Sequence, residues 1–312
     1  MRVFVAGASG AVGRPLVQRL LAAGHEVTGM TRSSPSAEAI RAMGARAVLV
    51  DVFDRDALTE AVGEAAPEVV VHELTSLPER FEPRKKDLYD ATNRVRTEGT
   101  LNLVNAASDA GATRIVCQSI AFGYAPAGGA LKSEEASLMT DAPPPFGEAL
   151  GAVEVMERMV LEADGLDGLV LRYGWFYGPG TYYAADGTLA ADVRRRRFPV
   201  VGEGSGVFSF LHVDDAADAT VAAVERGAPG IYNIVDDEPA PMRAWLPAYA
   251  QALGAKPPRR VPLWLARFVA GRLVAELSTT LPGASNEKAK RELGWRPAHP
   301  SWRTGFAQSL RA

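Results

Sequence analysis

Short continuous runs of apolar residues recur through the first half of the chain, and segments with apolar residues three or four apart follow most of them. Continuous runs of this length are typical of strands buried on both faces, and the wider spacing is typical of amphipathic helices. Strands are predicted over residues 3–6, 25–31, 45–51, 68–72, 113–119 and 166–171, and helices over 37–43, 56–64, 87–110 and 148–163. This alternation predicts an α/β fold with a parallel sheet and helices on both faces.

Three glycines follow the first predicted strand, in the run Gly7-Ala-Ser-Gly10-Ala-Val-Gly13, and an apolar helical pattern starts inside them. In a dinucleotide-binding loop the first glycine permits a tight turn and the second admits the pyrophosphate to the backbone. The third allows close packing of the helix, whose N-terminal amides bind phosphate. The residues predicted to contact a dinucleotide are Gly7, Ser9, Gly10, Ala11, Val12 and Gly13.

The second half of the chain has a different pattern. Glycine, proline and aromatic residues are scattered through 173–210, and the predicted helices (214–225, 243–253 and 263–277) are separated by irregular segments. A short strand is predicted over 231–234. We predict a Rossmann-type doubly wound sheet built from residues 1–172, to which 211–235 return, and a smaller substrate lobe built mostly from 173–312.

Charge and composition limit the classes of molecule with which this chain is expected to interact. The net charge of −3 gives no basis for a nucleic acid or an anionic membrane as partner, so a small-molecule substrate is expected. The single cysteine, Cys117, excludes an intrachain disulfide and suits a reducing cytoplasm. The four histidines and the cysteine form no ligand cluster, so no metal is predicted. No apolar run is long enough to span a membrane, and a homodimer is left open.

The second predicted strand ends in Met30-Thr31-Arg32-Ser33-Ser34. At this point an acidic residue binds the ribose 2′-hydroxyl of NAD, whereas an arginine accommodates the 2′-phosphate of NADP. There is no acidic residue here, and Arg32 with two serines is suited to clamp a phosphate, so NADP(H) is favoured over NAD(H). The alternative is that Arg32 is a solvated loop residue. Further cofactor contacts are expected from Asp51, Val52 and Leu74.

Other landmarks occur in a fixed order along the chain: Asn93 with Gly99-Thr-Leu-Asn-Leu103, Leu171-Arg-Tyr-Gly174 with Tyr177-Gly-Pro179, Phe210-Leu-His-Val-Asp-Asp215, Tyr232-Asn-Ile234 and the run from Ser285 to Trp295. With the glycine loop, these landmarks make the chain resemble an extended or atypical short-chain dehydrogenase/reductase of the NAD-dependent epimerase/dehydratase family. The resemblance implies a seven-stranded Rossmann sheet, a smaller substrate lobe and binding of NAD(P)(H).

The family's catalytic pair is missing. Its members resemble one another in a Tyr-x-x-x-Lys pair on one helix, with a serine or threonine after the fifth strand. Residues four apart share a helix face, so the ammonium lowers the phenol pKa and the phenol exchanges a proton while hydride moves. Here Phe146 and Leu150 occupy the tyrosine and lysine positions. No tyrosine in the chain has a lysine four residues later, so the pair is absent in any register.

Three sources of the proton are considered in place of the pair: Ser119, which ends the fifth predicted strand, Tyr124, which lies just beyond it, and water. Other claimants near the expected cleft are Gln118, His72, Glu73, Tyr173, Tyr177 and Tyr182. For each of them packing or backbone hydrogen bonding is the alternative role.

Three functions follow from these observations. The first is an NADP(H)-dependent oxidoreductase that acts on a small carbonyl or alcohol. The second is a redox-neutral epimerase, dehydratase or isomerase on the same fold. The third is a non-catalytic NADP(H)-sensing regulatory protein, which the missing pair favours. The intact second lobe, with Arg172 near the cleft, favours an enzyme, and we place the first function ahead.

Overall fold

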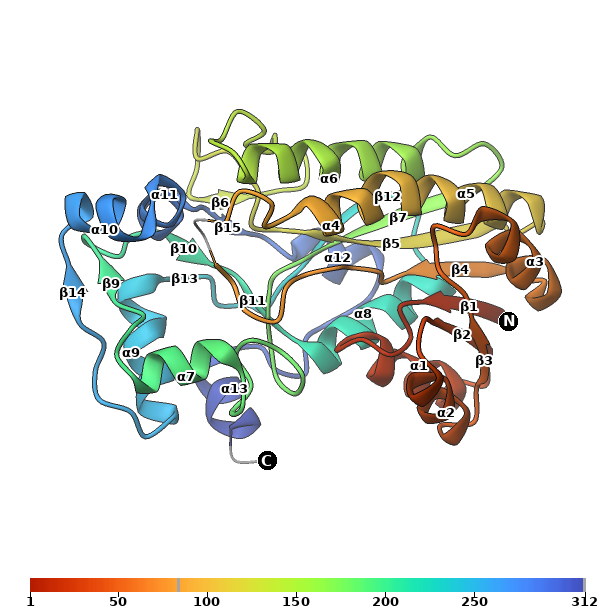
Figure 1. The fold of residues 1–312 in the computed structure, drawn as a ribbon, viewed down its shortest axis with the longest axis horizontal. Helices are drawn as coiled ribbons and strands as arrows, with labels where there is room; N and C mark the ends of the chain where they lie inside the picture. Colours follow the sequence, from red (N-terminus) through yellow and green to blue (C-terminus); the bar gives the residue numbers. More distant parts are fainter. Residues whose placement is uncertain (83–84, 311–312) are drawn as a thin grey trace.

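A computed structural model describes residues 1–82 and 85–310. Its central sheet has seven parallel strands in the order β12-β7-β5-β4-β1-β2-β3 (Figure 1). The strands are β1 (Arg2–Ala6), β2 (Glu26–Thr31), β3 (Arg46–Leu49), β4 (Val69–His72), β5 (Arg114–Ile120), β7 (Asp167–Tyr173) and β12 (Gly230–Ile234). From β1 the chain adds β2 and β3 toward one edge of the sheet and then adds β4 and the later strands toward the other edge. The crevice between β1 and β4, where the strand order reverses, is where such sheets bind ligands. The predicted Rossmann-type fold is confirmed.

Helices cover both faces of this sheet because its strands are apolar on both faces. Val3 and Val5 of β1 face the core under α1 (Gly13–Ala22), α2 (Ser34–Ala42) and α8 (Val213–Glu225). Phe4 of the same strand faces the opposite core, under α3 (Arg55–Ala65), α5 (Thr100–Asp109) and α6 (Phe146–Leu161). Figure 1 shows α5 and α6 on one side of the sheet and α1 and α8 on the other. The alternation along β1 thus produces two buried layers.

Two predicted helices are interrupted. The helix predicted over 87–110 consists of α4 (Asp90–Arg94), a π-helical turn η1 (Val95–Gly99) and α5. The π-turn places Arg96 in the interior, where its guanidinium donates to the Ala149 carbonyl oxygen at 3.3 Å. The helix predicted over 263–277 breaks at Gly271, whose φ of 92° ends α10 (Leu263–Ala270) before α11 (Arg272–Thr280).

The second lobe has an aromatic core. Its members include Phe210, Trp245, Tyr249, Trp302 and Phe306. The elements around this core are short: α7 (Thr188–Arg194), α9 (Met242–Ala252) and α13 (Trp302–Ser309), with the strand pairs β8 (Trp175–Tyr177) with β11 (Phe210–His212), β9 (Val200–Val201) with β14 (Arg260–Val261), and β10 (Val207–Phe208) with β13 (Ala240–Pro241). The remaining elements are β6 (Leu131–Lys132), paired with β15 (Gly283–Ala284), and α12 (Glu287–Glu292), which packs near β12. Aromatic packing therefore stabilises a lobe with little regular sheet.

Candidate cofactor and active site

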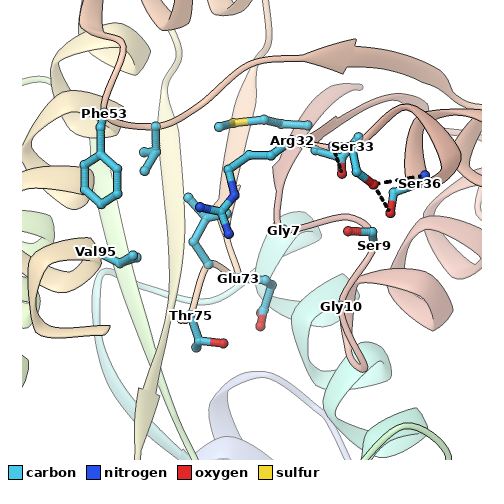
Figure 2. A pocket seen from close by; sticks show the side chains of 14 residues that line it. Gly7, Ser9, Gly10, Arg32, Ser33, Ser36, Phe53, Glu73, Thr75 and Val95 are labelled. Atoms are coloured by element: carbon cyan, nitrogen blue, oxygen red, sulfur yellow. Dashed lines mark hydrogen bonds between the residues drawn. The ribbon is translucent and has the colours of Figure 1, made fainter. Parts of the chain in front are cut away.

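A cavity of about 270 Å³ lies at the carboxyl ends of β1, β2 and β4 (Figure 2). Its walls come from the ends of these strands, from the loops that follow them, from the loop after β3 and from single residues of α2 and η1. The lining residues are Gly7, Ser9, Gly10, Met30, Thr31, Arg32, Ser33, Ser36, Val52, Phe53, Glu73, Leu74, Thr75 and Val95. The cavity therefore occupies the place where an open parallel sheet binds its ligand.

The glycine loop has the geometry that its sequence indicates. Gly7 has a φ of 95°, and a Cβ placed on it would lie 2.7 Å from the carbonyl carbon of Glu73. A Cβ on Gly13 would lie 2.1 Å from the Gly7 oxygen, so only glycine lets α1 approach the loop. Of the other predicted contacts, Ala11 and Val12 do not line the cavity, and Val12 packs in the core. Their contact with a cofactor stays a prediction.

One wall of the cavity is suited to an anion. Arg32 lies beside Ser33 and Ser36 (Figure 2). Ser33 Oγ caps α2 by accepting from the Ser36 amide at 3.3 Å, and it donates to Ser36 Oγ at 2.8 Å. Arg32, the two hydroxyls and the positive end of α2 thus line the same cavity, and the guanidinium extends from this wall toward its middle (Figure 2). Sequence reasoning missed Ser36, although the Ser-x-x-Ser spacing of an N-cap was a usable signal.

The predicted cofactor contacts Asp51 and Val52 lie just after β3. Val52 lines the cavity, and so does Phe53, which was not predicted. Asp51 does not line it: its Oδ1 accepts from the Phe53 amide at 3.0 Å, and its Oδ2 lies 3.9 Å from the Arg32 guanidinium. Asp51 therefore shapes the turn after β3 and approaches Arg32. The Phe53 ring offers a flat apolar surface, with the Arg94 guanidinium 3.8 Å from its centroid.

The segment after β4 contributes Glu73, Leu74 and Thr75 to the cavity. A Glu73 carboxyl oxygen lies 2.8 Å from the Tyr173 hydroxyl, which lies 2.6 Å from Thr220 Oγ1. Burial raises the pKa of Glu73 to about 8, so the carboxyl is protonated at neutral pH. The Tyr173 hydroxyl is buried, and burial raises its pKa well above the ordinary value.

His72 holds the end of β4 and does not line the cavity. Its Nδ1 accepts from the Leu74 amide at 3.2 Å, so Nε2 carries the hydrogen and lies 2.9 Å from Thr100 Oγ1. Burial lowers the pKa of His72 to about 4, which keeps the ring neutral. Gln118 also has a positioning role, because its amide donates to the Leu74 carbonyl oxygen at 3.3 Å.

Ser119 and Tyr124 lie in a buried ion-pair network. Ser119 Oγ donates to a Glu157 carboxylate oxygen at 2.6 Å, and Glu157 accepts two bonds from Arg172 at 2.6 and 2.8 Å. Tyr124 is fully buried and donates to Asn233 at 2.6 Å. The paired charges hold Arg172 and these hydroxyls in the interior. Their role in proton transfer stays a prediction that this geometry argues against.

Phe146 and Leu150 are core residues. Both lie at the start of α6 and are buried in a small apolar cluster with Leu273 of α11. The Phe146 ring centroid lies 6.3 Å from that of Tyr89. The helix face that would carry the family's proton-transfer pair is therefore an apolar contact surface, which neither donates nor accepts a proton.

Hydrogen bonds join the loop after β4 to the second lobe. Arg80 donates two hydrogen bonds to Asp192 of α7, at 2.7 and 2.8 Å, and the Tyr182 hydroxyl donates to the Pro78 carbonyl oxygen. Tyr182 thus has a positioning role, while Tyr177 is buried in the aromatic core of the lobe. Within residues 1–82 and 85–310 no three His, Cys, Asp or Glu side chains are grouped to hold a metal, and no helix is long and apolar enough to cross a membrane.

Comparison with known proteins decides the family. The model of the NAD dependent epimerase/dehydratase family matches residues 3–235, which include the glycine loop and the central sheet from the second residue of β1 to the end of β12. The chain belongs to the NAD-dependent epimerase/dehydratase family.

Relatives within this family include reductases. The chain is 49% identical, over 99% of its length and 100% of the relative's, to a 3-diazoavenalumate denitrifying reductase from a Streptomyces species. It is 28% identical to a 4-hydroxy-2-methyl-3-oxo-4-farnesyl-3,4-dihydroquinoline-1-oxide ketoreductase from Stigmatella aurantiaca, over 95% of this chain and 92% of the relative. Thermus thermophilus UDP-glucose 4-epimerase, solved in complex with NAD, superposes with a TM-score of 0.75 at 25% identity, covering 100% of this chain and 98% of that one.

Proposed function

We propose that this protein is an NADP(H)-dependent reductase that adds hydride to a small diazo or carbonyl compound. The observation that carries the proposal is the cavity wall on which Arg32, Ser33 and Ser36 stand beside the glycine loop. The name of the relative at 49% identity supports the reaction class, since it describes the reduction of a diazo compound with loss of nitrogen. The ketoreductase relative supports the carbonyl option.

The residues of the cavity fit a dinucleotide that carries a 2′-phosphate. Gly7 and Gly10 line the cavity without side chains, so a pyrophosphate would have access to the backbone there. Arg32 and the Ser33 and Ser36 hydroxyls supply hydrogen-bond donors for a phosphate on the adenosine ribose. Bound there, the nicotinamide would supply the hydride. Asp51 is 3.9 Å from Arg32, so it orients the guanidinium without neutralising it through a close pair.

The contacts of Arg80 and Tyr182 tie the loop after β4 to the second lobe, on the side where a substrate would meet the cofactor. Both substrate classes take up one proton with each hydride: a ketone yields an alcohol, and a diazo compound yields the C–H product and N₂. The buried Phe146 and Leu150 contribute no proton, so another group or water must supply it.

The test of this function has two stages. Quenching or enhancement of protein fluorescence on titration with NADPH and NADH measures cofactor binding, and we expect NADPH to bind more tightly. NADPH absorbance then follows turnover with two probe sets, a diazophenol carboxylate and a panel of small ketones and aldehydes. Failure of both dinucleotides to bind at sub-millimolar concentration refutes the proposal.

Two outcomes of the same assays would favour the other functions. Tight NADPH binding without turnover of any probe would favour the NADP(H)-sensing protein, as the missing Tyr–Lys pair does. Interconversion of a sugar nucleotide without net consumption of NADPH would favour the redox-neutral epimerase class, to which the Thermus thermophilus structure belongs.

A further inference from the structure

The proposed reduction consumes a proton, and the family's usual donor is absent. We propose that Glu73 supplies this proton as a neutral carboxylic acid, and that Tyr173 and Thr220 are positioning residues that keep it neutral. This inference rests on the proposed reductase function and adds the residue that completes its chemistry. It replaces the predicted donors Ser119 and Tyr124, which are committed to the buried Arg172 network.

Glu73 is an acidic residue in the wall of the proposed cofactor cavity. It lines the cavity together with Leu74 and Thr75, and its backbone lies directly beneath Gly7. Figure 2 shows its side chain on the side of the cavity away from Phe53, near Thr75. Among the fourteen described lining residues only Arg32 and Glu73 ionise, and Arg32 stays charged at any working pH. Glu73 is therefore the acid of this cavity.

The hydrogen bonds around Glu73 need its proton. Three contacts join four oxygens in a chain: Glu73 to Tyr173 at 2.8 Å, Tyr173 to Thr220 at 2.6 Å, and Thr220 to the Ala216 carbonyl at 2.8 Å. The two hydroxyls carry only two hydrogens, and the carbonyl carries none. A carboxylate would leave one contact with two oxygens and no hydrogen between them. A protonated Glu73 completes the chain, because it donates to Tyr173, Tyr173 to Thr220, and Thr220 to Ala216.

The surroundings of Glu73 favour the same state. The groups whose charge would act on it are Tyr173 and Cys117, both buried and both uncharged at neutral pH. The neighbouring His72 is neutral, and Thr220 and the Gly7 loop present no charge. Among the described residues no cation is recorded against the carboxyl, and burial opposes its ionisation, which gives the pKa of about 8.

The proton step is balanced as follows. The Glu73 O–H bond breaks, its proton goes to the substrate atom that has become basic on accepting hydride, and the electron pair stays on the carboxylate. The Tyr173 hydrogen then turns from Thr220 to the new carboxylate and stabilises it. A proton from water restores the acid. For a diazo substrate the departing group is N₂, and the reductant is NADPH.

The first test is Glu73→Gln. The amide can donate to Tyr173, so the chain of hydrogen bonds survives, but it carries no transferable proton. We expect kcat with the diazophenol carboxylate or a responsive ketone to fall by about 100-fold or more, with the Kd for NADPH changed less than about threefold. Glu64→Gln is the matched control, because Glu64 is exposed at the end of α3.

A second measurement reports the proton itself. The infrared difference spectrum between neutral and alkaline pH should show loss of a protonated carboxyl band, centred near pH 8, in the wild type and not in Glu73→Gln. Thr220→Val frees the Tyr173 hydrogen for a carboxylate, so it should shift this midpoint and the alkaline limb of kcat to lower pH.

The outcomes separate the two proposals. Wild-type turnover that Glu73→Gln retains within threefold, or a carboxyl already ionised at neutral pH, overturns the assignment of Glu73 and leaves the reductase function standing. Absence of turnover by the wild type with every probe overturns the proposed function. Loss of turnover in Glu73→Gln with the infrared band assigned to Glu73 supports both.

Discussion

Arg32→Ala tests the assignment of the anion-binding wall. The substitution removes the guanidinium that stands with Ser33 and Ser36 at the start of α2. A hydrogen bond to a charged partner is worth about 1.5–3 kcal/mol. Because the Arg32 side chain is 64% exposed and Asp51 lies 3.9 Å away, water and a competing carboxylate reduce this interaction. We therefore take the lower part of the range, which corresponds to about 10- to 30-fold weaker binding of NADPH.

The assay is a fluorescence titration of wild type and variant with NADPH and with NADH. NADH lacks the 2′-phosphate, so its Kd should change less than about threefold, and the NADPH effect should shrink at high salt because the interaction is exposed. Arg41→Ala is the control, since it removes an exposed arginine from the last turn of the same helix. Equal weakening of NADPH and NADH by Arg32→Ala would refute the 2′-phosphate assignment.

Three further predictions concern the acid, the missing pair and the buried ion pair. Because the pKa of Glu73 is raised to about 8, the carboxyl carries its proton below that pH. The kcat for reduction should therefore be constant up to about pH 8 and fall above it. A kcat that stays constant up to pH 10 would contradict this prediction. Leu150→Lys places a cation in a fully buried apolar site and should lower the free energy of unfolding by several kcal/mol in urea, whereas Leu150→Met should cost less than about 1.5 kcal/mol. Arg172→Met leaves the Glu157 carboxylate buried and unpaired and should lower the free energy of unfolding by about 3–5 kcal/mol. The double variant with Glu157→Leu should recover part of this loss. Equal stability of the single and double variants would show that the pair is not coupled.

The sequence determined the sheet and the cofactor loop because both are encoded locally. A strand buried on both faces needs a continuous apolar run, as in Val3–Ala6, and the turn into α1 needs glycine where a Cβ would strike backbone, as at Gly7 and Gly13. Arg32 was found for the same reason, since it directly follows β2 in sequence and in space. The loss of the Tyr–Lys pair was also readable, because its spacing is a property of one helix.

Only the tertiary structure decided which polar groups share the cavity. Glu73 and Tyr173 are 100 residues apart and Thr220 is 47 beyond, so the need for a proton on Glu73 arises only when β4, β7 and α8 come together. The same applies to Ser119 and Tyr124, which the sequence places at a strand end but which the buried Arg172–Glu157 pair draws into the interior. Local pattern sets where the chain turns and which faces it buries. The partner of a buried polar group is set by strands and helices distant in sequence, because burial obliges each such group to find a hydrogen bond wherever the fold supplies one.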